Sequence, residues 1–292
     1  MIRATILGCG SSGGVPRFGG ADGAGDWGDC DPSNPKNRRQ RCSLLLERTG
    51  PNGVSKVNID AGPDFRAQML QARVDMLDAL VLTHEHADHI HGIDDIRQFV
   101  NIRTYEEVGR LQTDPSFEMN RDIYLELVEK SRMDCFAGMT CYEAMLSNLG
   151  YLFTAAEGSL YPPIMHLRKI ENSFTIHGDG GEISLLPIPV PHGSINAYGF
   201  KINGLVYMPD VQDLTDEARE HIRDCDVLII DCLQFRTHGT HANYEMAMEW
   251  IDALKPKRGI LTNLHSSLDY DALEKMTPNH VTPAFDGMQI EI

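Results

Sequence analysis

The segment Thr83–His89 limits the possible folds more than any other part of the chain, because it places three histidines and an aspartate within positions 84–89. It directly follows the apolar run Ala79–Leu82, so we expect a buried strand that ends in a cluster of imidazole and carboxylate groups. Zinc, manganese and iron accept these ligand types. A His-x-His pair can arise by chance, and a lone surface histidine usually has no role. Four potential ligands this close together favour a metal site over that alternative.

Four further polar residues stand at the ends of expected strands: Asp60, His192, Asp210 and His265. Strand ends at one edge of a sheet converge, so groups that are distant in sequence can meet there. The first of two ions would be held by His84, His86 and His192. The second would be held by Asp88, His89 and His265, with Asp210 as the bridging carboxylate. Two ions about 3.5–4 Å apart activate a shared water and clamp the oxygens of a phosphoryl or acyl centre.

The net charge of −16 limits the partners of this chain of 292 residues. A strongly acidic surface repels a phosphate backbone, so a large nucleic-acid substrate is not expected. The basic segment Lys36–Arg41 is a local exception, and it could be a solvated loop or could bind a phosphate near the site. We expect no transmembrane helix, because no window approaches twenty uncharged apolar residues. The first ten residues are too poor in apolar side chains for a signal peptide, which predicts a cytoplasmic location.

Seven cysteines are scattered along the chain without a Cys-x-x-Cys pair. This pattern favours reduced thiols over a disulfide framework. Cys30 and Cys42 bracket a polar loop and could hold a structural metal together with a distant histidine. Plain free thiols are the simpler interpretation, because closely spaced partners are missing.

Short apolar runs bounded by Gly, Pro, Asp or Asn predict strands in both halves of the chain. The expected strands are 4–7, 43–47, 57–59, 79–82, 173–176, 182–187, 197–202, 205–208, 227–231 and 259–262. Expected helices are 64–72, a helix after the histidine cluster, 122–129, 213–223 and 243–254. The segment from about 101 to 165 is richer in charges and methionine. It predicts a helical insertion, either a lid over the site or a contact in a homodimer. Strand blocks alternating with helices predict two sheets covered by helices on the outside.

The order of these residues resembles the metallo-β-lactamase superfamily: His84-x-His86-x-Asp88-His89, then His192, Asp210 and His265. The resemblance covers almost the whole chain. It implies an α/β fold, the four-layer αββα sandwich, as a single domain over 1–292 with an insertion at about 101–165. It also implies a dinuclear site at one edge of the sandwich, holding two divalent ions, Zn²⁺ or Mn²⁺. Asp60 matches the family's strand-end aspartate, which implies that it hydrogen-bonds a ligand histidine.

Four segments resemble the PhnP branch, whose type member is a phosphoribosyl 1,2-cyclic phosphate phosphodiesterase: 7–16, 37–43, 84–97 and 237–241. The resemblance implies that a metal-bridging hydroxide attacks a small cyclic or nucleotide-like phosphodiester. His241 falls at the family's catalytic histidine and would protonate the departing alkoxide, and Asp88 would help to orient the water. His238, in the same segment, could instead be a bystander. One departure is that the branch carries a cysteine cluster forming a structural zinc site, whereas the corresponding loop here has only Cys30.

Other functions on the same fold stay open at this point. A tRNA 3′-processing endonuclease usually carries a long protruding arm with basic residues, and no such segment is visible in the sequence. A cofactor-biosynthesis protein resembling PqqB shares the fold. A metal-stabilised binding or carrier protein is the non-enzymatic alternative, which the intact ligand set with His241 disfavours.

Overall fold

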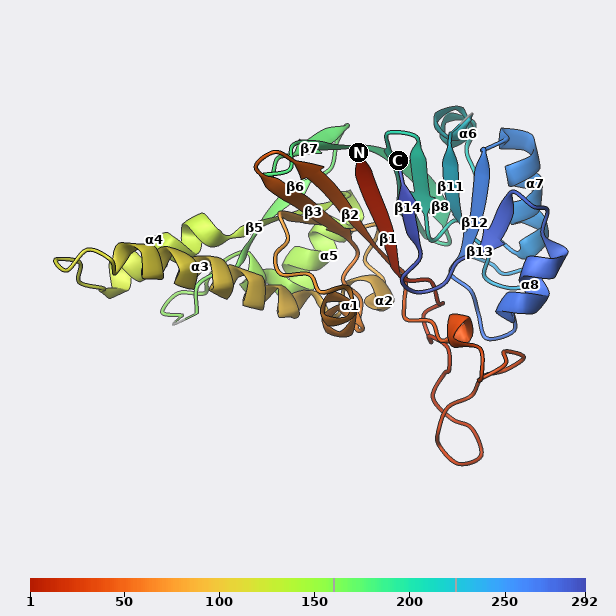
Figure 1. Cartoon of the computed structure of the whole chain (residues 1–292), viewed down its shortest axis with the longest axis horizontal. Helices are drawn as coiled ribbons and strands as arrows, with labels where there is room; N and C mark the ends of the chain where they lie inside the picture. The colour runs from red at the N-terminus through yellow and green to blue at the C-terminus, as the bar shows by residue number, and fades with distance from the viewer. Residues whose placement is uncertain (160, 224) are drawn as a thin grey trace.

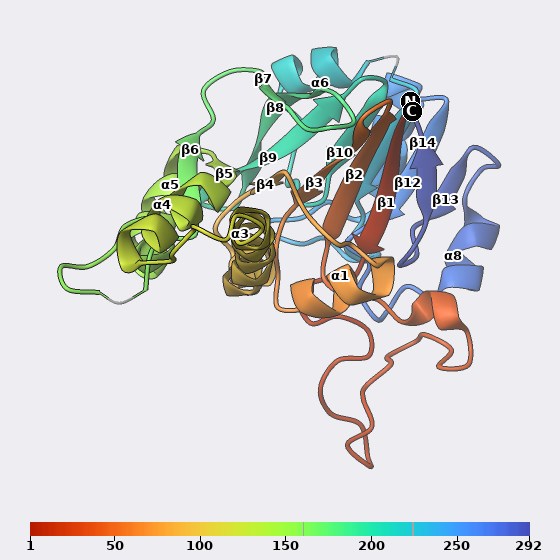
Figure 2. The same cartoon turned by 60° about the vertical axis from the view of Figure 1, so that its left-hand side comes forward.

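The computed structural model describes residues 1–159, 161–223 and 225–292, and its strands form two seven-stranded sheets that pack face to face. Helices cover the outer face of each sheet, so the molecule has four layers (Figure 1). This arrangement confirms the expected α/β sandwich of αββα type. The two chain termini lie close together at the end of the sandwich that is away from the long loop between the first two strands (Figures 1 and 2).

The first sheet combines antiparallel strands at one side with parallel strands at the other. Its order is β14 (Gln289–Glu291), β1 (Ile2–Gly8), β2 (Ser43–Gly50), β3 (Gly53–Ile59), β4 (Ala79–Val81), β5 (Met133–Ala137) and β6 (Met165–Lys169). Strands β3 to β6 run parallel. Their carboxyl ends therefore lie at one edge of the sheet, where the segment after β4 carries the histidine cluster.

The second sheet follows the same plan. Its order is β13 (Val281–Pro283), β12 (Arg258–Thr262), β11 (Val227–Asp231), β10 (Leu205–Met208), β9 (Ile195–Ile202), β8 (Ile183–His192) and β7 (Phe174–Ile176). Strands β10 to β13 are parallel. Gly10, just after β1, bridges to Leu264, just after β12, so the carboxyl edges of the two sheets meet. The strand ends that carry the candidate ligands therefore come from both sheets.

Three apolar clusters separate the four layers. One lies between the sheets and takes alternate side chains from each, such as Ile6 and Leu46 from the first and Tyr207 and Ile229 from the second. This alternation is what a strand buried on one face toward another sheet requires. The other two clusters lie between each sheet and its helices. The parallel strands β4, β10 and β11 are buried along their whole length, which explains why their sequences are almost continuously apolar.

Helices from several parts of the chain cover each sheet. The first sheet is covered by α1 (Phe65–Ala72), α2 (Ala87–Ile90), α3 (Arg97–Leu111), α4 (Arg121–Ser131) and α5 (Met139–Leu149), and the second by α6 (Asp216–Ile222), α7 (Tyr244–Leu254) and α8 (Tyr270–Met276). Short 3₁₀ turns occupy Pro35–Asn37, Ile93–Ile96 and Gly150–Leu152. Asn243 caps the start of helix α7, since its side chain accepts a hydrogen bond from the Met246 amide (2.9 Å), and the helix buries Trp250 and Ile251.

The segment from about 101 to 165 contains more of the sandwich than its sequence indicates. Strand β5 and the first residue of β6 lie in it and extend the first sheet, and neither strand is apparent from the sequence alone. Strands β13 and β14 and helices α5 and α8 are also absent from the expected elements. Helices α3 and α4 form an arm that projects from the body (Figure 1). The sequence does not predict this arm, in which acidic residues outnumber basic ones. The division into one domain with an insertion stays a prediction.

Within the described residues, the longest apolar helical stretch falls short of what crossing a bilayer requires. The long loop between β1 and β2, drawn in orange-red, projects from the edge of the sandwich at which the parallel strands end (Figures 1 and 2).

Candidate metal centre

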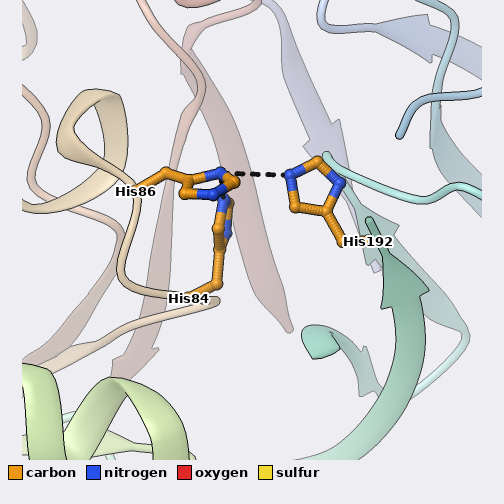
Figure 3. Close-up of side chains that lie close together, drawn as sticks. All are labelled: His84, His86 and His192. Carbon is orange, nitrogen blue, oxygen red and sulfur yellow. Dashed lines mark hydrogen bonds between the residues drawn. The ribbon is translucent and has the colours of Figure 1, made fainter. Parts of the chain in front are cut away.

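The strand ends bring three histidines from both sheets together. His84 and His86 follow β4, and His192 is the last residue of β8. His84 Nε2 lies 3.0 Å from His86 Nδ1, and His192 Nε2 lies 3.1 Å from the same His86 atom. Figure 3 shows the three rings directed toward one another across the gap between the sheets. Their ligand nitrogens all lie within 4.8 Å of one another.

Hydrogen bonds at the far side of two of these rings decide which nitrogen faces the cluster. The Thr83 hydroxyl donates to Asp60, so it accepts from His84 Nδ1–H at 2.9 Å. His192 Nδ1–H donates to the backbone carbonyl oxygen of Thr240 at 2.8 Å. Each neutral ring carries one proton, so the Nε2 atoms of both rings present lone pairs to the cluster. Burial lowers the pKa of His84 and of His192, which keeps both rings in the neutral form that binds metals.

A second group forms around His89, on the short helix α2 that follows the cluster. Its Nδ1 lies 2.7 Å from Asp60 Oδ2, and its Nε2 lies 3.0 Å from Asp210 Oδ2 and 3.4 Å from Asp88 Oδ2. Asp60 is fully buried and also accepts the Thr83 amide at 2.8 Å. It adopts a positive φ of 67°, a conformation that non-glycine residues reach at a cost. Asp60 therefore orients His89, the contact that the family resemblance implies.

Asp210 lies between the two groups of histidines. Together with His84 and His89 it forms one set of closely spaced ligand atoms, and together with His192 and His241 it forms another. Burial opposes ionisation, but the neighbouring His89 outweighs it and holds the pKa of Asp210 well below its usual range. Asn263 Nδ2 donates to its Oδ1 at 3.2 Å, whereas Oδ2 is buried without a hydrogen bond of acceptable geometry. A carboxylate in this position suits the bridging role expected from the sequence.

These observations fit a divalent cation. Three imidazole rings meet at about hydrogen-bond distance, and the tautomers deduced for His84 and His192 turn lone pairs toward the centre. Two carboxylates flank His89, and Asp210 Oδ2 makes no hydrogen bond of acceptable geometry although His89 Nε2 lies 3.0 Å away. A cation would remove both the lone-pair repulsion and the excess negative charge. Imidazole and carboxylate ligands together suit zinc or manganese.

His265 is placed less directly than the other expected ligands. It follows β12 and lines the same pocket of about 320 Å³ as Asp88 and His241. Its Nε2, however, lies 3.0 Å from Arg17 Nη1, which can only donate a hydrogen bond. Among the described residues, the tightly spaced ligand sets contain neither His265 nor Asp88. The structure thus gathers His84, His86, His89, His192 and Asp210, and it leaves Asp88 and His265 at the margin of the group.

His241 is held next to the cluster by an aspartate. Its Nδ1 lies 2.8 Å from Asp231 Oδ2, and its ring centroid lies 4.7 Å from that of His192. Burial lowers the pKa of His241, but the hydrogen bond and charge of Asp231 outweigh it and raise the pKa to about 9. Asn263 Nδ2 also donates to Asp231 Oδ1 at 3.2 Å. The pair leaves His241 Nε2 as the nitrogen able to give a proton. The His238 ring lies beside His241, with 5.2 Å between the centroids.

Several residues of the centre were not predicted from the sequence. Asp231 ends β11, so the strand-end rule that selected Asp60 and Asp210 would also have selected it. Asn263, immediately after β12, has a positive φ of 60° and contacts both Asp210 and Asp231. Thr83 and the Thr240 carbonyl act only by orienting rings, and no sequence pattern reveals such contacts.

The basic segment Lys36–Arg41 is mostly structural. Arg39 is only 2% exposed, and its guanidinium donates to the carbonyl oxygens of Leu268 (2.7 Å) and His265 (3.3 Å). Arg41 pairs with Asp64 at 2.8 Å. Arg39 is not a solvated loop residue, so that interpretation is wrong for it.

The thiols of Cys30 and Cys42 are buried and free. Cys30 Sγ donates to the Leu268 carbonyl at 3.4 Å, and Arg39 Nη1 lies 3.9 Å from it. Among the described residues no cysteine belongs to a set of potential metal ligands. Both cysteines therefore match the free-thiol interpretation of the sequence.

Comparison with known proteins places this geometry in a family. Residues 55–263 match the family described as the beta-lactamase superfamily domain. The crystal structure of a diphosphatase from the PhnP family is similar over 100% of this chain and 98% of its own, with a TM-score of 0.78 and 26% identity. Zn²⁺-bound PqqB from Methylobacterium extorquens is similar over 99% of this chain and 100% of its own, with a TM-score of 0.66 and 17% identity.

A curated relative has a different name. An octanoyltransferase of Porphyromonas gingivalis (strain ATCC BAA-308 / W83) is 27% identical over 291 residues, which is 99% of this chain. The chain spans only 51% of that protein. The relative's name therefore describes a protein about twice as long as the matched region.

Proposed function

Because this chain belongs to the beta-lactamase superfamily, we propose that it is a dinuclear metal-dependent phosphodiesterase that hydrolyses a small phosphodiester. The observation that carries the proposal is the position of His241 and Asp231 beside converging imidazole lone pairs. A cluster of metal ligands alone would suit a metal-stabilised binding protein equally well. A proton donor that a buried aspartate orients beside these ligands is what general acid catalysis requires.

The proposed ligands for the first ion are His84, His86 and His192, and those for the second are Asp88, His89 and His265, with Asp210 shared. Two divalent cations, Zn²⁺ or Mn²⁺, would supply Lewis acidity that activates water and offsets charge on the phosphoryl oxygens. Asp60, Thr83 and the Thr240 carbonyl hold three of the ligand rings in the required tautomers. These contacts fix which nitrogen atom of each ring faces the site before a metal ion binds.

In the proposed reaction, water adds to phosphorus and one phosphorus–oxygen ester bond breaks. The departing oxygen takes a proton from His241 Nε2, because Nδ1 is engaged with Asp231. Asp231 keeps the ring oriented and stabilises its protonated form. Asp88 lines the same pocket and would orient the attacking water.

The substrate class follows from the pocket and from the relatives. The pocket of about 320 Å³ is small, and the net charge of −16 opposes a polyanionic partner, which favours a small phosphodiester over tRNA. The similarity to a PhnP-family diphosphatase supports hydrolysis at a phosphoryl centre. The resemblance of the sequence to the PhnP branch favours a cyclic phosphodiester of the phosphoribosyl type or a nucleotide-like ester. A tRNA 3′-processing endonuclease and a PqqB-like role remain the alternatives. The α3–α4 arm lacks the basic surplus that tRNA binding would require.

Acyl transfer by a thiol receives no support from the pocket. All seven cysteines are buried and none lines this pocket among the described residues. Burial raises the pKa of Cys9, Cys42 and the other fully buried thiols, which disfavours a thiolate nucleophile.

Activity of the metal-loaded protein against a panel of substrates tests the proposal. The protein is reconstituted with Zn²⁺ or with Mn²⁺ and assayed on cyclic phosphodiesters, linear phosphodiesters and a tRNA precursor. We expect hydrolysis of small phosphodiesters and none of the precursor. Cleavage of the precursor alone would replace the proposal with the endonuclease alternative, and inactivity on the whole panel would contradict it.

A further inference from the structure

We propose that Asn263 is a positioning residue that links Asp210 of the metal centre to the Asp231–His241 pair. Its single amide group aligns the proposed bridging ligand and the proposed proton donor with each other. This inference rests on the proposed function and adds to it a residue that holds no cation and transfers no proton. The reaction described above does not use this side chain.

The side-chain nitrogen of Asn263 lies between two carboxylates. Its Nδ2 lies 3.2 Å from Asp210 Oδ1 and 3.2 Å from Asp231 Oδ1. An amide nitrogen carries two hydrogens, so it can donate one to each acid. With the amide turned over, its oxygen would face two carboxylate oxygens with no hydrogen between them, so the surroundings set its orientation. One side chain therefore bonds two acids that serve different parts of the proposed reaction.

Asn263 holds the same oxygen of each acid and leaves the other oxygen to the centre. Asp210 Oδ2 lies 3.0 Å from Nε2 of His89, a proposed metal ligand. Asp231 Oδ2 lies 2.8 Å from Nδ1 of His241, the proposed proton donor. Because the two oxygens of a carboxylate turn together, a bond to Oδ1 also fixes the direction of Oδ2. The amide of Asn263 therefore orients both functional oxygens at once.

No other donor takes the place of Asn263. Within the described part of the chain, no further group makes a hydrogen bond to Oδ1 of Asp210 or of Asp231. Asp210 is 3% exposed and Asp231 is fully buried, so water has little access to either acid. A buried carboxylate oxygen that loses its donor is costly, and the two negative charges repel each other. Without the amide, both acids would turn away from their present directions.

Contacts from both sheets fix the backbone around Asn263. The residue directly follows β12 and has a φ of 60°, a left-handed conformation that asparagine and glycine adopt more readily than most residues. The next amide, that of Leu264, donates to the carbonyl oxygen of Cys9 just after β1 (2.8 Å). The side chain is thus anchored where the carboxyl edges of the two sheets meet. A glycine here would remove the amide group and keep the backbone conformation.

Asn263→Gly tests the link with three measurements on Zn²⁺-loaded protein. Zn²⁺ affinity, from competition with a chelator, reports on Asp210. The low-field proton resonance of His241 Nδ1–H, assigned by its absence in His241→Ala, reports on the Asp231–His241 pair. The third measurement is kcat on a phosphodiester with a poor alkoxide leaving group and on a nitrophenyl ester, with and without His241→Ala. Asn203→Gly is the control, because Asn203 has a similar φ of 52°, is exposed and does not line the pocket.

We expect Asn263→Gly to weaken Zn²⁺ binding about 10-fold and to shift or broaden the His241 resonance. At saturating Zn²⁺, kcat on the poor leaving group should fall about 10- to 100-fold, and several-fold less on the nitrophenyl ester. In the His241→Ala background the two losses should become equal, because coupled residues are not additive. Asn203→Gly should behave as wild type, and thermal unfolding would check that each variant folds.

Unchanged Zn²⁺ affinity or an unchanged His241 resonance in Asn263→Gly would overturn the link, since one of the two contacts would then have no consequence. A selective loss on the poor leaving group that persists without His241 would also overturn it. If the wild type hydrolyses neither ester while Zn²⁺ affinity and the resonance change as expected, the link stands and the proposed function alone is contradicted.

Discussion

His84 and His192 in the first half of the metal centre differ from His265 in the second half in how they are held. His84 and His192 are buried, and a hydrogen bond from Nδ1 to Thr83 or to the Thr240 carbonyl fixes each ring. His265 is half-buried, and its Nε2 contacts Arg17 of the long loop. The first half is therefore prepared for a cation by rigid strand ends. In the proposed assignment, His265 would exchange its contact with Arg17 for a cation, so the second half would be the side nearer to the long loop.

The largest expected effect is on metal content, which should differ between variants of the two halves. His84→Ala should lose the ion that His84, His86 and His192 would share, and turnover should fall about a thousandfold or more, because several kcal/mol of charge stabilisation is lost. His265→Ala should keep that ion and lose only the second. Elemental analysis of purified, reconstituted protein gives the stoichiometry, with near two ions expected for the wild type.

His91→Ala is the control for these variants, since His91 lies on the same segment with an exposed side chain. Retention of both ions by His84→Ala would contradict the ligand assignment. Equal metal loss in His84→Ala and His265→Ala would remove the difference between the halves.

The next effect concerns the proton donor that lies beside the first half. His241→Ala should lower kcat about 10²- to 10⁴-fold on a phosphodiester with a poor alkoxide leaving group, because that oxygen needs a proton as it departs. A nitrophenyl ester should lose much less, since its leaving group is stable as an anion. His238→Ala is the matched control, because its ring lies beside that of His241 in the same pocket. Equal losses on both esters would remove the general-acid role.

A smaller effect is expected from the residue that orients His89. Asp60→Asn should weaken metal binding about 10- to 100-fold, because the His89 Nδ1–H loses its charged acceptor and the Thr83 network is disturbed. Competition titration with a chelator measures the affinity. Asp78→Asn is the control, since Asp78 is another carboxylate of the first sheet, located before β4 and bonded to the Lys56 amide. Metal affinity that falls equally in both variants would indicate general destabilisation instead.

The smallest effect is a pH dependence. The pKa of His241 is raised, so its protonated form is fully present at low pH and is lost as the pH rises through that value. The rate on a poor leaving group should therefore fall about tenfold for each pH unit on the alkaline side. Bound cations would oppose the ring's charge, so the fall should begin below pH 9. The descending limb should be missing in His241→Ala, and a limb that persists there would belong to another group.

The sequence predicts the fold well where a strand is apolar and bounded by turn residues. The expected strands 205–208 and 227–231 match β10 and β11 residue for residue. Strands β5 and β6 are not apparent, because their sequences contain charged residues and lie in or next to a stretch dominated by helices. Their pairing in the sheet, β5 with β4 and β6 with β5, supplies the stabilisation that local propensity does not.

The same contrast holds at the candidate site. Residues that are both close in sequence and chemically distinctive, as in Thr83–His89, can be recognised from the order of amino acids alone. Asn263 and Arg17 could not be assigned roles in this way, because each acts through a partner that is distant along the chain. The strand-end rule would have selected Asp231, but not its contact with His241. Such contacts depend on how strands and loops pack in the folded chain, and no local pattern encodes them.

The sequence by itself determined the family resemblance, the alternation of strands and helices, and the chemical type of the centre, because ligand identity and spacing are properties of the chain. The tertiary structure decided which lone pairs converge, that Asp231 holds His241, and that Arg17 contacts His265. The physical reason is that tautomers and charge pairs depend on distances of about 3 Å between segments from different strands and loops. Only the tertiary packing of those strands and loops sets those distances.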